Sequence, residues 1–266
     1  MQKNKKNLAG YPVEEGISIY CPCGNREHNL EFAIESWLKC ESIDEIVIVD
    51  WNSNPPVSVT DPRIVLVRAE GVEWKNSAHA LNLGARFTRY DKICKFDVDY
   101  IVARDFFSQH ELSEKTFFAG NFKNSRDMNE RHIHGFLYTY RDDFFEMNGF
   151  TERVETYGWE DTDMYERLTE AGLERLDVNL DKIYHLIHSD SKRVMNAKSS
   201  WGSTRPDELT YKNRELCKQN PWTKKDKMMD FNVWEVNKEE GLEYYCPKEI
   251  IKNLKQYFLC EFKNED

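Results

Sequence analysis

Two acidic clusters in this 266-residue chain could bind a metal ion or accept a proton. Asp97 and Asp99 are two residues apart and follow an apolar run, so an extended segment would direct both carboxylates to the same side. Hard divalent cations prefer oxygen ligands and often complete their coordination with substrate phosphates. The pair therefore predicts a metal site at the end of a strand, although the same spacing also occurs by chance on surface loops.

The second cluster contains Glu160, Asp161 and Asp163 and opens a predicted helix. The positive end of a helix dipole stabilises an ionised carboxylate, so one of these residues is a candidate general base. The alternative is ordinary acidic decoration of a first helical turn. The preceding residues include Tyr157 and Trp159 around a glycine, which suggests a flexible segment that lays an aromatic ring against an apolar ligand face.

Two histidines, His185 and His188, follow a short apolar run and are three residues apart. Imidazole binds Mn²⁺ and other transition ions, so the pair could complete a site begun by the aspartates. A solvated surface pair is the competing interpretation. His132 and His134 lie in a charged stretch and are taken as surface residues.

Three further residues could contact a nucleotide. Asp50 follows a predicted strand and could accept a hydrogen bond from a base N–H or a sugar hydroxyl, or it could simply initiate the turn that follows. Arg26 and Arg68 could contact a diphosphate, or they could be solvated.

The elements that must position these residues alternate between strands and helices. Short apolar runs predict buried strands, and apolar residues recurring every three or four positions predict helices. The strands are expected at 17–21, 45–50, 63–68 and 92–97, and the helices at 27–39 and 75–89. This alternation indicates a mostly parallel sheet, whose ligands lie beyond the carboxyl ends of the strands.

The second half of the chain is less regular. Strands are expected at 117–122 and 135–140, and a helix at 161–171, so mixed pairing of strands is plausible there. From Ser199 onward the sequence is polar, and it ends in a helical pattern at 248–259.

Composition excludes several classes of protein. The chain is 40% hydrophobic and 13% aromatic, which indicates a folded globular domain. Its 37 basic and 47 acidic residues give a net charge of −10, which argues against nucleic acid as a partner. Seven cysteines without a C-x-x-C pair favour reduced, buried thiols and a cytoplasmic location. No apolar stretch has the length of a signal peptide or a membrane span, so no transmembrane segment is expected, although peripheral membrane association stays possible.

Six segments match, in order, motifs of one enzyme family. Over about residues 15 to 200 the chain resembles glycosyltransferases of the GT-A fold, most strongly the β-1,4-galactosyltransferase and bacterial chondroitin-polymerase-like group. The matching segments are Pro22 with Asn25 to Leu30, Asn76 to Gly84, Asp97-Val98-Asp99, Asn148-Gly149-Phe150, Glu160 to Leu168, and His188-Ser189.

The resemblance implies an α/β, Rossmann-like nucleotide-diphospho-sugar transferase fold with a mixed, mostly parallel sheet flanked by helices. It implies one domain over 1–266, with a nucleotide-sugar half at 15–100, an acceptor and catalytic half at 101–200 and a helical extension at 201–266. A UDP-sugar would be held by Pro22, Asn25, Arg26, Asp50, Asn52, Asn76, Asn82 and Asp97. Mn²⁺ or Mg²⁺ would be bound by Asp97, Asp99, His185 and His188.

The resemblance also implies an inverting transfer to a saccharide acceptor, in polysaccharide or glycoconjugate synthesis. Asp161 would be the catalytic base, and Glu160, Trp159 and Tyr157 would bind the acceptor. The chain departs from the family at Gly24 and Ser77, which stand where animal galactosyltransferases have arginines. UDP-galactose and UDP-N-acetylgalactosamine are the leading donors, with UDP-glucose or a glucuronic acid donor as alternatives. An inactive nucleotide-sugar-binding scaffold and a metal-dependent hydrolase are the competing functions.

Overall fold

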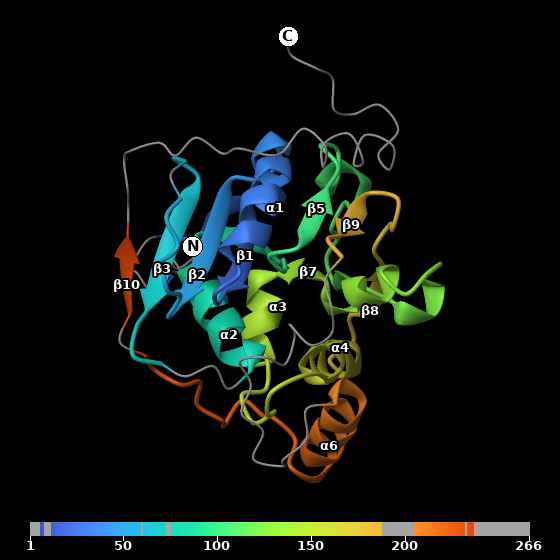
Figure 1. Ribbon diagram of the computed structural model, residues 1–266. Coiled ribbons are helices and arrows are strands. Elements are labelled where there is room, and N and C mark those ends of the chain that lie inside the picture. Colours follow the sequence, from blue (N-terminus) through green and yellow to red (C-terminus); the bar gives the residue numbers. More distant parts are fainter. Residues whose placement is uncertain are drawn as a thin grey trace.

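The computed structural model describes residues 6–7, 12–59, 61–72, 76–187, 205–231 and 233–236. Within these ranges the chain forms an eight-stranded sheet in the order β10-β3-β2-β1-β4-β7-β6-β8 (Figure 1). The strands are β1 (Glu14–Cys23), β2 (Glu45–Trp51), β3 (Ile64–Ala69), β4 (Tyr90–Lys95), β6 (Thr116–Ala119), β7 (Leu137–Tyr140), β8 (Glu174–Asp177) and β10 (Val233–Val236).

The sheet is mixed and mostly parallel, as expected. Strand β1 pairs in parallel with β2 and β4, β2 pairs in parallel with β3, and β6 pairs in parallel with β8. The remaining pairs, β10 with β3, β4 with β7, and β6 with β7, are antiparallel. Every residue of β2 is buried, because helices cover both faces of the parallel half.

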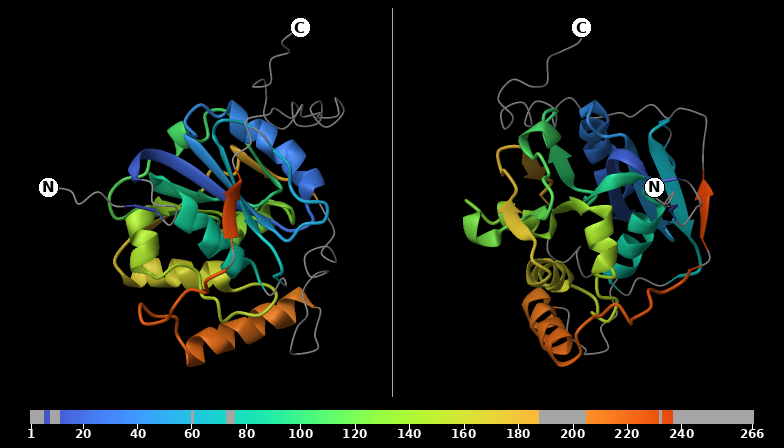
Figure 2. Two further views of the ribbon diagram at one scale, coloured as in Figure 1. Left: turned by 90° about the vertical axis from the view of Figure 1, so that its left-hand side faces the viewer. Right: turned by 180° about the vertical axis from the view of Figure 1, so that it is seen from behind.

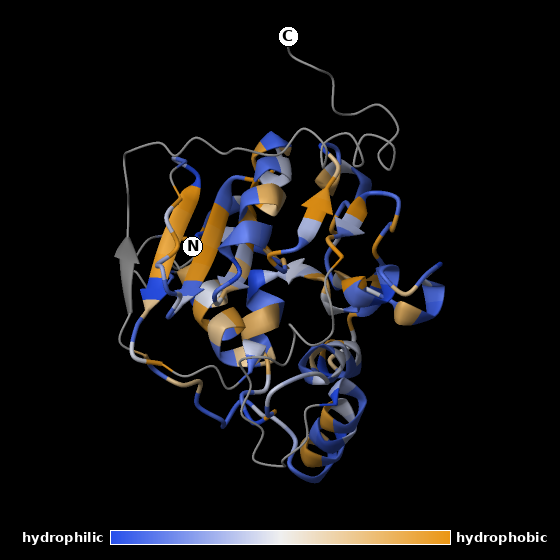
Figure 3. Cartoon of the chain, viewed as in Figure 1, coloured by the Kyte–Doolittle hydropathy of each residue, from blue (hydrophilic) through white to orange (hydrophobic). Residues whose placement is uncertain are grey.

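Two helices make the layers on either side of this half. Helix α1 (Glu27–Lys39) packs its Leu30, Ile34 and Trp37 with alternate strand residues such as Ile46 and Ile48. Helix α2 (Ser77–Phe87) packs with the intervening residues, including Val47 and Val49 of β2. Successive strand residues point to opposite faces, so one continuous apolar run supplies both cores. Figure 3 shows β2 and β3 coloured as strongly hydrophobic.

The remaining elements surround the other half of the sheet. Strands β5 (Tyr100–Val102) and β9 (Ile183–His185) form a separate antiparallel pair. Helix α4 (Glu160–Glu170) lies beside α6 (Pro206–Gln219) in both views of Figure 2. The other short elements are α3 (Arg141–Glu146) and the 3-10 helices η1 (Phe107–Gln109), η2 (Phe122–Asn124) and η3 (Glu130–Gly135).

Most expected elements of the first half occur within a few residues of their expected bounds. The strand expected at 117–122 ends at Ala119, and η2 begins at Phe122 instead. The helix expected at 248–259 lies outside the described residues. The five cysteines in the described ranges are free and buried. Among the same residues, no helix combines the length and apolar character needed to cross a bilayer.

Candidate active site

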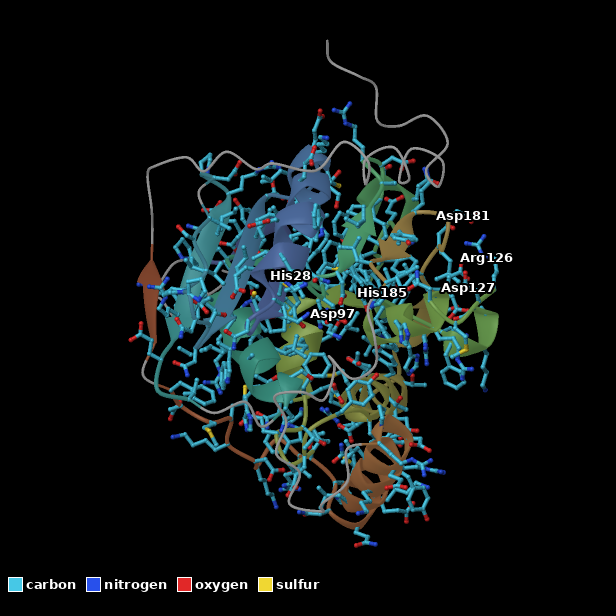
Figure 4. The ribbon with its side chains drawn as sticks, in the orientation of Figure 1. His28, Asp97, Arg126, Asp127, Asp181 and His185 are labelled. Atoms are coloured by element: carbon cyan, nitrogen blue, oxygen red, sulfur yellow. The ribbon has the colours of Figure 1, made fainter. Side chains whose placement is uncertain are left out.

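The candidate residues meet at the carboxyl ends of the parallel strands. The register pairs Cys23 of β1 with Asp50 of β2, and Tyr20 of β1 with Lys95 of β4. The segments that follow these strands therefore leave the sheet at a common edge, the usual place for ligands in such sheets. Figure 4 shows Asp97 and His185 toward the middle of the molecule, whereas Arg126, Asp127 and Asp181 lie at its periphery.

The Asp99 carboxylate lies next to a guanidinium group and an imidazole ring. The side chain is buried, and its Oδ2 accepts a hydrogen bond of 2.7 Å from Nη2 of Arg26. The same oxygen lies 3.6 Å from Nε2 of His185. The β5–β9 pair creates this proximity, because it aligns Tyr100 with His185 and lets Leu186 N–H donate to the Asp99 carbonyl. Two residues that are far apart in sequence thus share one site.

Asn129 fixes the orientation of the His185 ring. Its Nδ2 donates to the His185 carbonyl at 2.9 Å, and its Oδ1 lies 2.8 Å from His185 Nδ1. An amide oxygen only accepts, so Nδ1 carries the hydrogen, and in the neutral ring the lone pair is on Nε2, the atom nearest Asp99. Metal-binding histidines are commonly held by such a bond to the other ring nitrogen. Sequence reasoning missed Asn129, which precedes η3 without a recognisable motif.

The donor atoms of this pair fit a divalent cation. A carboxylate oxygen and an oriented imidazole nitrogen are both ligands for Mn²⁺. His188 lies outside the described residues. Within the described residues no group of three His, Cys, Asp or Glu side chains is arranged around a common metal position. Among the described residues, Asp99 and His185 are therefore the two candidate ligands.

Asp97 and Asp99 have different partners, and the extended segment from which we predicted a shared direction is not observed. Strand β4 ends at Lys95, and residues 98–99 form a turn in which Tyr100 N–H donates to the Asp97 carbonyl. The segment is not extended, so the alternation on which the prediction relied does not apply. Asp97 instead places Oδ1 3.2 Å from Nζ of Lys95.

Lys95 connects Asp97 to the candidate base. Its buried Nζ donates to the Gly135 carbonyl at 2.7 Å and lies 3.3 Å from Oδ1 of Asp161. Nearby carboxylates raise the pKa of Lys95 above its usual value, against the effect of burial, so the side chain stays charged. A buried charge needs such partners. Sequence reasoning missed Lys95, because its strand also contains the charged residues Asp91 and Lys92.

Asp161 lies in the first turn of α4. Burial raises its pKa to about 7, although the positive charge of Lys95 acts in the opposite direction. Gly135 leaves room for the pair, because a Cβ there would lie 2.7 Å from Lys95 Nζ and 2.9 Å from Asp161 Oδ2. A carboxylate whose pKa lies near neutrality is suited to accept a proton.

The neighbouring Glu160 is held by Ser77. Glu160 Oε1 accepts a 2.7 Å hydrogen bond from Ser77 Oγ, while Oε2 is buried and has no hydrogen-bond partner among the described residues. Ser77 is the first residue of α2 and stands where the family resemblance led us to expect an arginine. The departure therefore places a hydroxyl against the predicted acceptor-binding carboxylate.

The sequence analysis took His134 as a surface residue, whereas its side chain is only partly exposed and both ring nitrogens have neighbours. Its Nε2 lies 3.1 Å from Thr162 Oγ1 and its Nδ1 lies 3.2 Å from the Gly120 carbonyl. Burial is the main reason that the pKa of His134 falls to about 4, so the ring is neutral at physiological pH. The ring of His132 lies with its centroid 5.0 Å from that of His185. Both histidines thus border the site.

Two of the residues predicted to hold the UDP-sugar make hydrogen bonds within the fold. Asn82 is completely buried, with Oδ1 accepting from Phe150 N–H and Nδ2 donating to the Phe150 carbonyl and to Glu152. Asn76 is also buried and donates to the Val154 carbonyl. Both side chains bind the 150–154 segment. The oxygen and the nitrogen of the Asn82 amide are both engaged in this way, which argues against contact with a sugar nucleotide. Asn76 Oδ1 is buried without a hydrogen-bond partner among the described residues, so binding of the donor by Asn76 stays a prediction.

Other residues predicted to hold the UDP-sugar cluster at the ends of β1 and β2. Asp50 accepts hydrogen bonds from Ser53 N–H and Val57 N–H, and from Arg68. Asn25 accepts from Asn54 N–H. In addition, Asn52 accepts from Gly71 N–H, and the partly exposed Pro22 precedes Arg26 at the same edge. Their contact with a donor stays a prediction.

Comparisons with known proteins agree with this architecture. A family model described as the N-terminal domain of galactosyltransferase matches residues 113–189. A comparison with curated protein sequences finds no match. The Drosophila β1,4-galactosyltransferase 7 catalytic domain in complex with xylobiose is similar in structure, with a TM-score of 0.51 and 20% identity over 75% of this chain and 80% of that one.

A mutant of the same Drosophila enzyme, in complex with manganese, UDP-Gal and xylobiose, has a TM-score of 0.50 and 17% identity over 73% of this chain and 79% of that one. The fold is therefore that of the GT-A glycosyltransferases. Together with the galactosyltransferase segment, which contains both Asp161 and His185, it indicates that the chain is a glycosyltransferase.

Proposed function

We propose that the chain is an inverting, metal-dependent glycosyltransferase. It moves a hexose or N-acetylhexosamine from a UDP-sugar to a hydroxyl of a saccharide acceptor, in polysaccharide or glycoconjugate synthesis. The observation that carries the proposal is the contact of the buried Lys95 ammonium with the carboxylates of both Asp161 and Asp97. Lys95 thus connects the candidate base on α4 to the segment after β4, which contains Asp99.

Asp161 is the base in this proposal. It takes the proton of the acceptor hydroxyl as that oxygen bonds to C1 of the donor sugar and the bond from C1 to UDP breaks. Attack from the face opposite UDP inverts the anomeric configuration. Lys95 keeps its own proton and holds the carboxylate in place, and the pKa of about 7 lets Asp161 accept a proton at neutral pH.

Asp99 and His185 would hold Mn²⁺ or Mg²⁺, with His188 as the further predicted ligand. When bound, the ion neutralises negative charge on the diphosphate leaving group. Arg26 lies beside Asp99 and is placed to contribute positive charge at the same position. The complex of the Drosophila enzyme with manganese, UDP-Gal and xylobiose supports this assignment and makes UDP-galactose the leading donor, with UDP-N-acetylgalactosamine next.

The test is a transfer assay with purified protein, a panel of UDP-sugars and a panel of saccharides, in Mn²⁺ or in EDTA. The proposal predicts acceptor-dependent release of UDP in Mn²⁺ only, with a product of inverted configuration by NMR. UDP release at the same rate without acceptor would indicate a hydrolase. Binding of UDP-sugar without turnover of any acceptor would indicate a scaffold.

A further inference from the structure

Helix α6 lies against the segment that leads into the predicted catalytic residues. The segment, residues 155–159, ends at the N-terminus of α4, and α4 and α6 lie side by side (Figure 2). Three side chains of α6 face the segment: Thr210, Asn213 and Arg214. No motif pointed to a role for this part of the chain.

Asn213 makes the densest set of contacts. Its side chain is fully buried, and its Oδ1 accepts a 2.8 Å hydrogen bond from Glu155 N–H. Its Nδ2 lies within donating distance of three carbonyl oxygens, those of Glu155 at 2.9 Å, Tyr157 at 3.1 Å and Gly158 at 2.8 Å. One amide group thus contacts backbone groups of three of the five residues in the segment.

The segment has a backbone shape that needs such support. Thr156 has a φ of 62° and Trp159 a φ of 81°, which are left-handed values that cost energy for residues with a side chain. Gly158 has a φ of 87°, and a Cβ at this position would collide with the Thr210 side chain. Strained conformations persist only where the surroundings impose them, and here α6 supplies those surroundings.

The shape of the segment determines where the acceptor residues lie. Trp159 immediately precedes α4 as its N-cap, and its carbonyl accepts from Asp163 N–H. The guanidinium carbon of Arg214 lies 5.5 Å from the centroid of the Trp159 ring. Glu160 follows immediately and reaches Ser77 across the site. A change at Asn213 would therefore shift Trp159 and Glu160 relative to α2.

We propose that Asn213 is a positioning residue for acceptor binding, acting from α6 through the 155–159 segment. The inference rests on the proposed function, because it assumes that Trp159 and Glu160 contact a saccharide. Asn213 directs its described hydrogen bonds to this segment, whereas Asp99 and His185 are held by β5, β9 and Asn129. Loss of the Asn213 side chain should therefore weaken binding of the acceptor and leave binding of the nucleotide-sugar donor unchanged.

The experiment compares Asn213→Ala and Asn213→Asp with the wild type in two measurements. Acceptor KM should rise about tenfold or more, because a small displacement of a positioning group has effects of that order. The Mn²⁺-dependent affinity for UDP should change less than about twofold. Asn213→Asp should be the more severe variant, because a carboxylate would face three carbonyl oxygens without hydrogens to donate. In parallel, hydrogen exchange at the Glu155 amide should accelerate in Asn213→Ala, which removes the oxygen that accepts from this N–H.

Cys217→Ala is the matched control. Cys217 is buried on the same helix and packs into the core, so the variant removes packing from α6 without removing any group that bonds Asn213. Its acceptor KM and the exchange of the Glu155 amide should match the wild type. Unchanged acceptor KM and unchanged exchange in Asn213→Ala would overturn the inference. If the wild type transfers no sugar, the proposed function fails, while the exchange measurement still decides whether Asn213 holds the segment.

Discussion

The ammonium nitrogen of Lys95 lies 3.3 Å from Oδ1 of Asp161 and so joins the end of β4 to the start of α4. Burial raises the pKa of Asp161 and the lysine charge lowers it. The readiness of Asp161 to accept a proton is therefore a balance between these two effects. Two predictions concern this balance directly.

The first prediction is a pH profile. Asp161 must be deprotonated to act as a base, and its pKa is raised from the ordinary aspartate value to about 7. Below that pH the carboxyl is mostly protonated, so kcat/KM should fall about tenfold per pH unit, and above it kcat/KM should level off. The measurement is kcat/KM for the acceptor between about pH 5 and 9 with saturating Mn²⁺. A flat profile across about pH 7 would contradict the assignment.

The second prediction concerns Lys95→Met. The substitution keeps the bulk of the side chain and removes the charge that lowers the pKa of Asp161, so the acid limb of the profile should move to higher pH. Lys92→Met is the control, because Lys92 lies on the same strand and its ammonium is near Asp91 at the surface. Circular dichroism should show folded protein in both cases. An acid limb that does not move in Lys95→Met would show that Lys95 does not tune the base.

The third prediction concerns the metal. Asn129→Ala removes the partner that orients His185, and loss of such a partner typically weakens metal affinity about 10 to 100-fold. Calorimetric titration with Mn²⁺ in the presence of UDP measures the effect. Asn124→Ala is the control, because Asn124 bonds Asp177 at an exposed position. Equal affinities in the two variants would remove Asn129, and with it the orientation of His185, from the metal site.

The parallel half of the fold could be predicted because its signals are local. The helix expected at 27–39 is observed as Glu27–Lys39, and the strand expected at 45–50 is observed as Glu45–Trp51. Helix α6 has no comparable signal. Its buried positions are Leu209, Asn213 and Cys217, so the stripe that a periodicity search would detect contains a polar residue at its centre. The proposed role of Asn213 depends on residues 155–159, which are separated from it in sequence by α4, β8 and β9.

The site could be predicted only in part, for a similar reason. The predicted residues Asp99, Asp161 and His185 do lie at the carboxyl edge of the sheet or next to it, but the partners of Asp161 and His185 are not in the motifs. Lys95 and Asn129 act through tertiary contacts that no spacing indicates. Asn82 shows the converse, because this residue of a matched motif is completely buried and bonds the Phe150 backbone.

The most direct test of the central claim is Asp161→Asn, assayed for transfer and for Mn²⁺-dependent UDP binding in the same preparation. The amide has nearly the same shape but cannot accept the proton. Transfer should fall by about 10² to 10⁴-fold, the usual contribution of a general base, while the affinity for UDP should stay within about twofold of the wild type. Transfer at the wild-type rate would contradict the account, because the proton would then leave the acceptor by another route.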